Sequence, residues 1–184
     1  MLFRSNYLRC LIALREYDKA EKLVKKVQKR APDNPGLLVD LGYVYFLEGA
    51  GDKSKETYEK ALKSIKPDRN SVLAVANGFM MRHEIEYAVS AYLEGKKLLK
   101  GEYGFFFELA DVYYQKSDYA EMINEYLDAV ADNPMVQQQV LNILQSRIGY
   151  DPENKRPDLL RTALLRRIQR NPDQTYFSEM LIWL

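Results

Sequence analysis

The sequence offers few side chains of the types that catalyse reactions or hold metal ions. It has one histidine, His83, and one cysteine, Cys10. A single cysteine excludes an internal disulfide and a cysteine-based zinc site, because both need at least two. Ser–His–Asp catalysis would depend on His83 alone. This residue falls between two apolar-periodic stretches, so we expect it to be a turn residue. Cys10 is expected to be a small core residue of the first helix.

Two further patterns resemble chemical motifs but lack features that those motifs require. Residues 49–54 read Gly-Ala-Gly-Asp-Lys-Ser, but they lack the spaced glycines and the preceding strand of a phosphate loop. Carboxylate pairs such as Glu84 and Glu86 are expected to be surface charges of helices, not an acid/base pair. No catalytic constellation remains. The sequence therefore predicts no enzyme, no metal site and no cofactor.

The overall composition is that of an ordinary globular domain. The 184 residues are 47% hydrophobic and 29% charged, with 27 Lys and Arg against 26 Asp and Glu. This balance excludes a largely disordered chain and gives no general attraction to nucleic acid or to an anionic membrane. No apolar run approaches the ~18–20 residues of a membrane-spanning helix. The N-terminus lacks signal-peptide features. The compartment stays open, because a single cysteine suits both the cytoplasm and a periplasm-like space.

The elements that must position any binding residues repeat along the chain. When the sequence is cut every 34 residues, the blocks 1–34, 35–68, 69–102 and 103–136 align without a gap. Two columns are mostly small and two are mostly aromatic. The small columns are Leu8, Gly42, Ala76, Ala110 and Val27, Ala61, Gly95, Ala129; the aromatic columns are Leu11, Tyr45, Phe79, Tyr113 and Val24, Tyr58, Tyr92, Tyr126.

Helix packing explains these columns physically. Each block reads as two amphipathic helices, with apolar residues at i, i+3, i+4 and i+7. A small residue lets the neighbouring helix approach, and an aromatic ring from that helix fills the remaining volume. Asn-Pro pairs at 34–35, 133–134 and 171–172 place an N-cap before a proline. Helices are therefore expected to begin near residues 35, 134 and 172.

The pattern resembles the tetratricopeptide repeat, a 34-residue helix–turn–helix unit. The resemblance implies an all-α fold: a right-handed superhelix, or α-solenoid, of antiparallel helix pairs, with about five repeats and a terminal helix. It predicts one domain over 1–184. Its parts are repeats 1–34, 35–68, 69–102, 103–136 and 137–171, a loop insertion at 149–156 in the fifth repeat, and a terminal helix 172–184. Pro157 is expected to open the second helix of the fifth repeat.

The resemblance also implies a function, that of a protein–protein interaction scaffold. The concave groove of such an array is lined mainly by the first helix of each repeat, and in the family it commonly holds a peptide or protein segment. Aromatic, methionine and amide side chains dominate this face and suit a partly apolar peptide. Some of them would instead pack against the next helix. The candidate residues are Val39, Tyr43, Phe46, Leu73, Asn77, Met80, Met81, Phe107, Asp111, Tyr114, Gln138, Leu141 and Gln145.

Two alternatives stay open. The chain could be a structural spacer that self-associates through its apolar end at Trp183, or an accessory segment of a larger protein. Because residues 180–184 are consecutive apolar residues, we expect 1–184 to be a segment of a longer repeat protein. The partner is expected to be a protein or peptide.

Charge is polarised locally. Block 1–34 has nine basic and four acidic residues, whereas block 103–136 has one basic and seven acidic. Such blocks either orient a dipolar partner or form solvated outer faces. Arg166, Arg167 and Arg170 lie opposite the leucines of the helix after Pro157 and could touch phosphates. No aromatic residues are interleaved with them and acidic residues flank them, so no nucleic-acid partner is expected.

Overall fold

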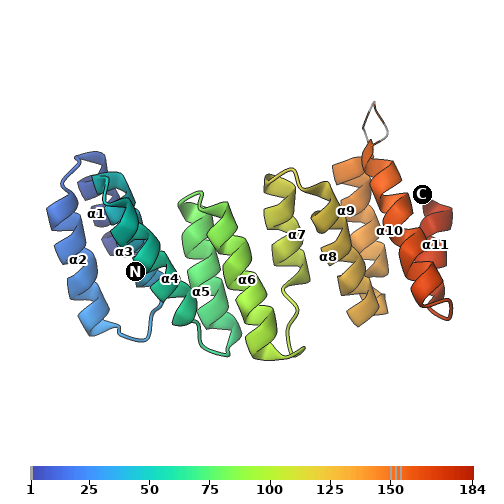
Figure 1. Ribbon diagram of the computed structural model, residues 1–184, viewed down its shortest axis with the longest axis horizontal. Coiled ribbons are helices and arrows are strands. Elements are labelled where there is room, and N and C mark those ends of the chain that lie inside the picture. Colours follow the sequence, from blue (N-terminus) through green and yellow to red (C-terminus); the bar gives the residue numbers. More distant parts are fainter. Residues whose placement is uncertain (1, 150, 152, 154) are drawn as a thin grey trace. The chain divides into compact units, whose positions relative to one another are not determined.

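The computed structural model describes residues 2–149, 151, 153 and 155–184, and every regular element in these ranges is helical. Figure 1 shows how successive helices fold back on one another. Two compact units are present, Met1–Tyr103 and Gly104–Leu184. The sequence suggested one continuous domain. The all-α fold built from antiparallel helix pairs is confirmed.

Met1–Tyr103 contains helix pairs with short connections. The pairs are α1 (Leu2–Ala13) with α2 (Tyr17–Arg30), α3 (Gly36–Glu48) with α4 (Gly51–Lys63), and α5 (Arg69–Met81) with α6 (Ile85–Leu99). Helix α3 also packs against α2 and α5, and α4 packs against α6. Each pair therefore buries its apolar stripe against the next, which a single pair could not do alone.

Gly104–Leu184 begins with a pair and then departs from simple pairing. The helices α7 (Phe106–Gln115) and α8 (Tyr119–Asp132) pack together, and the 3₁₀ turn η1 (Pro134–Val136) leads into α9 (Gln137–Ile148). Helix α10 (Lys155–Arg170) packs against α8 and also against α11 (Thr175–Trp183). Helix α8 thus lies at the centre of this unit.

The small and aromatic columns pack as their residue types predict. Gly42 and Tyr58 show the reason directly, since a Cβ placed on Gly42 would lie 2.4 Å from the Tyr58 ring. Tyr58 is 2% exposed, and Ala61 of the same helix is fully buried. The tyrosine ring therefore occupies the volume that the glycine leaves open.

The turn between the two helices of each pair also repeats with the 34-residue period. Arg15, Gly49, His83 and Ser117 all have positive φ, at 57°, 87°, 59° and 59°. In each case the amide of the next residue donates a backbone hydrogen bond to the carbonyl five residues before it, in the last turn of the first helix of the pair, such as Glu84 N to Phe79 O at 3.0 Å. Glycine adopts this conformation without strain, whereas the other residues accept it as single turn residues. His83 is therefore a turn residue, as predicted.

Some predicted boundaries need correction. Asn34 and Asn133 accept hydrogen bonds from the amides of Gly36 and Met135, both at 3.1 Å, so the first two expected starts are right. The last helix begins at Thr175, three residues after Pro172. Helix α10 begins at Lys155, two residues before Pro157. Proline is tolerated there because the first helical turn has unpaired amides. The expected insertion 149–156 includes residues 150, 152 and 154, which lie outside the described part.

Candidate protein-binding surfaces

The candidate binding residues of Met1–Tyr103 lie on α3 and α5, the first helices of their pairs. Phe46 and Met81 are the most accessible, with 55% and 72% of their surface exposed. Asn77 is also exposed, and three others are half-buried, namely Tyr43, Leu73 and Met80. A solvent-exposed phenylalanine or methionine can cover an apolar ligand group.

Val39 is corrected from a binding residue to a core residue. Its side chain is fully buried and faces α5, where a Cβ placed on Gly78 would lie 3.3 Å from the Val39 Cβ. Because α3 and α5 approach closely at Gly78, the valine fills the contact between them and no partner can reach it.

A three-residue cluster orders the accessible aromatic side chains of α3. Arg82, at the end of α5, donates a hydrogen bond from Nη2 to Asp40 Oδ1 at 2.9 Å. Its guanidinium carbon also lies 4.7 Å from the centroid of the Tyr43 ring. The Tyr43 ring stacks in turn with Phe46, with centroids 6.4 Å apart and planes at 20°. Arg82 is thus held both by an ion pair and by a ring contact, and it fixes the position of the Tyr43 ring.

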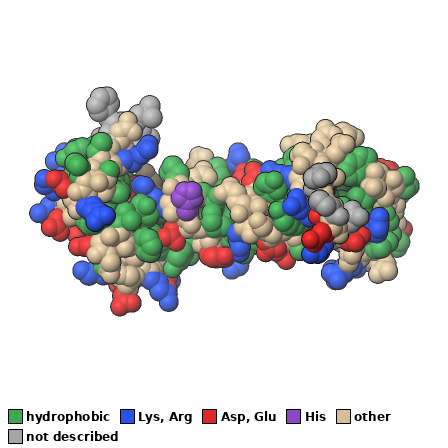
Figure 2. All heavy atoms as spheres, turned by 90° about the horizontal axis from the view of Figure 1, so that it is seen from above, with side chains coloured by type: hydrophobic (Ala, Val, Ile, Leu, Met, Phe, Trp, Pro, Cys, Tyr) green, Lys and Arg blue, Asp and Glu red, His purple; other side chains and the backbone are tan. Residues whose placement is uncertain are grey.

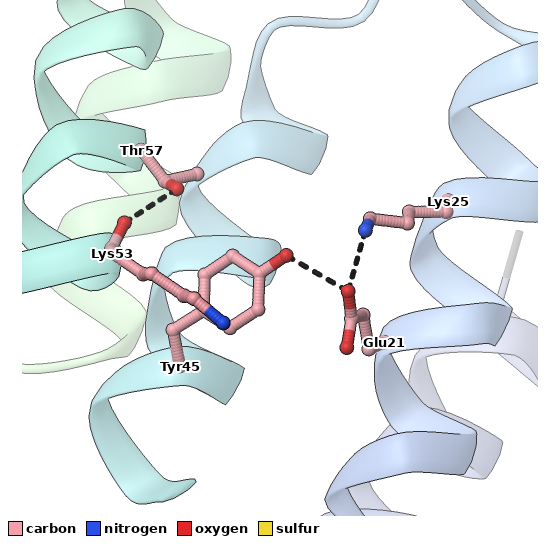
Figure 3. A network of polar contacts seen from close by, with 5 residues as sticks. All are labelled: Glu21, Lys25, Tyr45, Lys53 and Thr57. Carbon is pink, nitrogen blue, oxygen red and sulfur yellow. Dashed lines mark hydrogen bonds and ion pairs between the residues drawn. The ribbon is translucent and has the colours of Figure 1, made fainter. Parts of the chain in front are cut away.

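A second set of contacts fastens α3 to its other neighbours. Tyr45 lies two residues from Tyr43 and so points to the opposite side of the helix. Figure 3 shows its hydroxyl donating to Glu21 Oε1 at 2.9 Å, while Lys25 contacts the same carboxylate. These hydrogen bonds, from Lys25 first and Tyr45 second, hold the pKa of Glu21 below its usual value. The network joins α2 to α3 without using the Tyr43 face.

A tyrosine of α6 positions Asn77 of α5, an amide side chain of the candidate surface. The Tyr92 hydroxyl donates to Asn77 Oδ1 at 3.3 Å. Tyr58, in the same column one repeat earlier, donates instead to Glu84 Oε1 at 3.3 Å. Burial, followed by the nearby charge of Glu84, raises the pKa of the Tyr58 phenol. Asn77 is therefore oriented by a buried tyrosine and presents its amide to solvent.

The candidate residues of Gly104–Leu184 lie on α7 and α9. Tyr114 is 39% exposed, and Phe107 is half-buried. The polar candidates Asp111, Gln138 and Gln145 are all exposed. Leu141 requires correction, because it is 6% exposed and belongs to the core on the inner side of α9.

A cluster like that of Arg82 recurs around Arg147 of α9. Its Nη2 donates to Asp111 Oδ1 at 2.6 Å, and its guanidinium carbon lies 4.5 Å from the Tyr114 ring centroid and 5.6 Å from that of Tyr126. The Tyr126 hydroxyl donates to the same Asp111 oxygen at 3.3 Å. Burial raises the pKa of the Tyr126 phenol. Phe107 meets the Tyr126 ring edge-on at 5.8 Å.

Comparison with protein families agrees with the repeat pattern. Residues 11–76 match the family model described as tetratricopeptide repeat. These residues therefore carry a tetratricopeptide repeat pattern. A search of curated proteins finds no match.

Several solved structures are similar to this chain at low sequence identity. YrrB, described as "a TPR protein with an unusual peptide-binding site", shares 13% identity at a TM-score of 0.44, covering 95% of this chain and 88% of that one. MamA shares 18% identity at a TM-score of 0.41, covering 93% of this chain and 90% of that one.

The tetratricopeptide repeat fold is a protein–protein interaction scaffold and is generally non-catalytic. Across the described ranges, no three His, Cys, Asp or Glu side chains gather into a metal-binding group. Nor is any described helix long and apolar enough to cross a membrane. Side chains of both charges are mixed over the face seen in Figure 2, where His83 also lies at the surface.

Sequence reasoning missed three residues of these clusters: Asp40, Arg82 and Arg147. The signal that could have found them is an Asp-x-x-Tyr spacing, present at 40–43 and again at 111–114. Residues three apart share a helix face, so one cation from the next first helix can reach both side chains. Cys10 was also misjudged, since it is exposed on α1.

Proposed function

We propose that the chain binds a partly apolar peptide or protein segment on the face formed by α3 and α5, and that it has no catalytic activity of its own. The observation that carries the proposal is the exposure of Phe46, which stacks on the ordered Tyr43 ring of α3, together with the exposure of Met81 on α5. Their exposed apolar area would be buried by a ligand, and burial of such area is the main favourable term in association.

The polar groups on this face suit a peptide backbone. Asn77 has its Oδ1 engaged by Tyr92, which leaves the Nδ2 amide to donate to a ligand carbonyl. Arg82 is already paired with Asp40 and so serves to hold Tyr43 in place. A ligand with one or two apolar side chains and an extended backbone fits these groups best.

The α7 and α9 face of Gly104–Leu184 offers a second patch of the same kind. Tyr114 is held by Arg147 as Tyr43 is held by Arg82. Exposed amides at Gln138 and Gln145 take the place of the methionines of α5. We propose that this patch prefers a more polar ligand segment than the α3 and α5 face does.

The test uses peptides selected from a displayed random library on the intact chain, followed by fluorescence anisotropy. We expect Phe46→Ala to weaken binding about tenfold, because removing an interface aromatic costs more than about 1 kcal/mol. Leu93→Ala on α6, where the leucine is 38% exposed, is the matched control and should bind normally. Full binding by a well-folded Phe46→Ala/Tyr114→Ala variant would exclude both faces.

A second candidate function is self-association through α11. Ile182 and Trp183 are 86% and 39% exposed, so the end of this helix carries uncovered apolar area. Sedimentation equilibrium across a wide concentration range tests this candidate. A concentration-dependent dimer that Ile182→Asp abolishes would support it, and a monomer throughout would exclude it.

A further inference from the structure

A groove with an apolar half and a basic half runs between α8 and α10 in Gly104–Leu184. The two helices run in the same direction, since residue numbers rise together along both walls. Arg167 of α10 forms the floor: its Nη2 pairs with Asp128 Oδ1 at 2.7 Å and donates to the Asn124 carbonyl at 3.2 Å. These contacts fix the spacing between the helices.

Two adjoining clefts make up the groove, with volumes of about 510 and 480 Å³. They share Asn124, Ala163 and Arg166, so they form one continuous depression. The first cleft is mainly apolar and includes Leu159, which is 40% exposed. The second includes Arg170 beside Arg166, one helical turn apart on the same wall.

Some charged side chains of the groove form ion pairs and others do not. Arg167 is neutralised by Asp128, and Asp158 is paired with Arg161 at 3.4 Å. Arg166 and Arg170 are exposed and have no carboxylate partner among the described residues. Glu121, on the opposite wall, is the one carboxylate of the described lining outside an ion pair. Two unpaired guanidinium groups against one carboxylate leave the basic half attractive to an anion.

We propose that the groove between α8 and α10 binds an acidic peptide segment. An apolar side chain of the ligand packs against Leu159 and Ala163. A carboxylate of the same ligand, no more than one helical turn further along the groove, pairs with Arg166 and Arg170. Guanidinium groups bind carboxylates through paired, charge-assisted hydrogen bonds, which suits this end of the groove. The site lies on second helices and is separate from the faces of the proposed function.

A peptide fits this groove better than a nucleic acid does. Bases need aromatic rings to stack on, and the described lining of both clefts contains none. Half of the groove is apolar, and charged phosphates make no favourable contact with apolar side chains. Glu121 also repels a phosphate backbone, whereas a peptide can pair a lysine or an amide with it.

The experiment selects 12-residue peptides from a displayed random library on the full chain and measures the binding of labelled hits by anisotropy. We expect hits rich in Asp and Glu with at least one large apolar residue. Arg166→Glu/Arg170→Glu should weaken their binding at least tenfold, and Arg166→Gln/Arg170→Gln should do so less. Leu159→Ser should weaken it about threefold. Phe46→Ala should leave it unchanged, which separates this site from the α3 and α5 face.

Lys22→Glu/Lys26→Glu on α2 is the matched control. It makes the same charge change at the same spacing, at exposed lysines with no ion-pair partner among the described residues. Equal loss in this control would reduce the effect to general electrostatics and overturn the proposal. So would the absence of acidic hits sensitive to the arginine pair. Tighter, arginine-dependent binding of a 12-nucleotide oligouridine than of any hit would reassign the groove to nucleic acid.

Discussion

The clusters around Arg82 and Arg147 use the same three residue types in two different registers of the repeat. In Met1–Tyr103, Arg82 pairs with Asp40 and lies over the Tyr43 ring. In Gly104–Leu184, Arg147 pairs with Asp111 and lies over the Tyr114 ring. Asp111 nevertheless occupies the column of Tyr43, three positions later than Asp40. The geometry therefore depends on the i, i+3 spacing of Asp and Tyr and on a cation from the next first helix, not on the column.

The two clusters differ in how deeply they connect to the core. Arg147 lies over two rings, and its partner Asp111 also accepts the hydroxyl of the fully buried Tyr126. Arg82 lies over the half-buried Tyr43. A cluster that is hydrogen-bonded to a fully buried ring should contribute more to stability than one without such a ring. The predictions below test this difference.

The largest effect is expected from removing the ring of each cluster. Tyr126→Ala should lower the free energy of unfolding by about 3–5 kcal/mol, because it leaves a cavity in a packed core. Tyr43→Ala should cost about 1–2 kcal/mol, since its ring is only half-buried. Urea unfolding followed by circular dichroism measures both, and fluorescence of Trp183 reports on Gly104–Leu184. Equal losses would show that Tyr126 is not the deeper anchor.

Removing the arginines should have the next largest effect. Arg147→Ala is expected to cost about 2 kcal/mol and Arg82→Ala about 1 kcal/mol, below the loss for a fully buried ion pair because both arginines are partly exposed. Double-mutant cycles with Asp111→Asn and Asp40→Asn isolate the ion-pair contribution. A larger loss for Arg82→Ala, or no coupling in either cycle, would contradict the comparison.

Removing one hydroxyl at a time should give a smaller effect. Tyr126→Phe deletes a hydrogen bond to the carboxylate of Asp111, and Tyr92→Phe deletes one to the amide of Asn77, both 3.3 Å long. We expect about 1 kcal/mol for the first and about 0.5 kcal/mol for the second, because bonds to charged acceptors are stronger. Thermal unfolding of the two variants decides the order, and the reverse order would refute it.

The smallest effect should appear in alkaline solution. Burial raises the pKa of Tyr58 in one unit and of Tyr126 in the other. Their contribution to stability is complete below the unfolded-state value near 10 and is lost as pH rises toward the folded-state value. By pH 10 each phenol should cost about 0.4 kcal/mol. Tyr58→Phe/Tyr126→Phe should flatten the decline of the urea midpoint between pH 8 and pH 10, and an unchanged slope would rule this out.

Much of the fold could be predicted from local pattern. Helices, their pairing and the turn at Gly49 follow from apolar period and from a left-handed position that glycine prefers. Periodicity could not tell which side of an inner helix meets its neighbour. Val39 and Leu141 were placed on the binding face and are in fact core residues, because helices approach most closely where a residue such as Gly78 allows it.

The charge blocks show the same limit. Block 103–136 looks strongly acidic in sequence, yet Asp111 and Asp128 are neutralised by Arg147 and Arg167 from the helices that follow. On α2, by contrast, Lys22 and Lys26 stay exposed without an ion-pair partner among the described residues. A count along the chain cannot separate these cases, because ion pairs form across helices.

By itself, the sequence determined the repeat, the all-α fold and the kinds of side chain available for binding, since these follow from spacing within a helix and its turn. Only the tertiary structure decided which of those side chains remain accessible and which charges remain unpaired. Accessibility depends on how closely two helices approach, and pairing depends on which side chains meet across them. Both are set by contacts between residues distant in the chain, which no local period records.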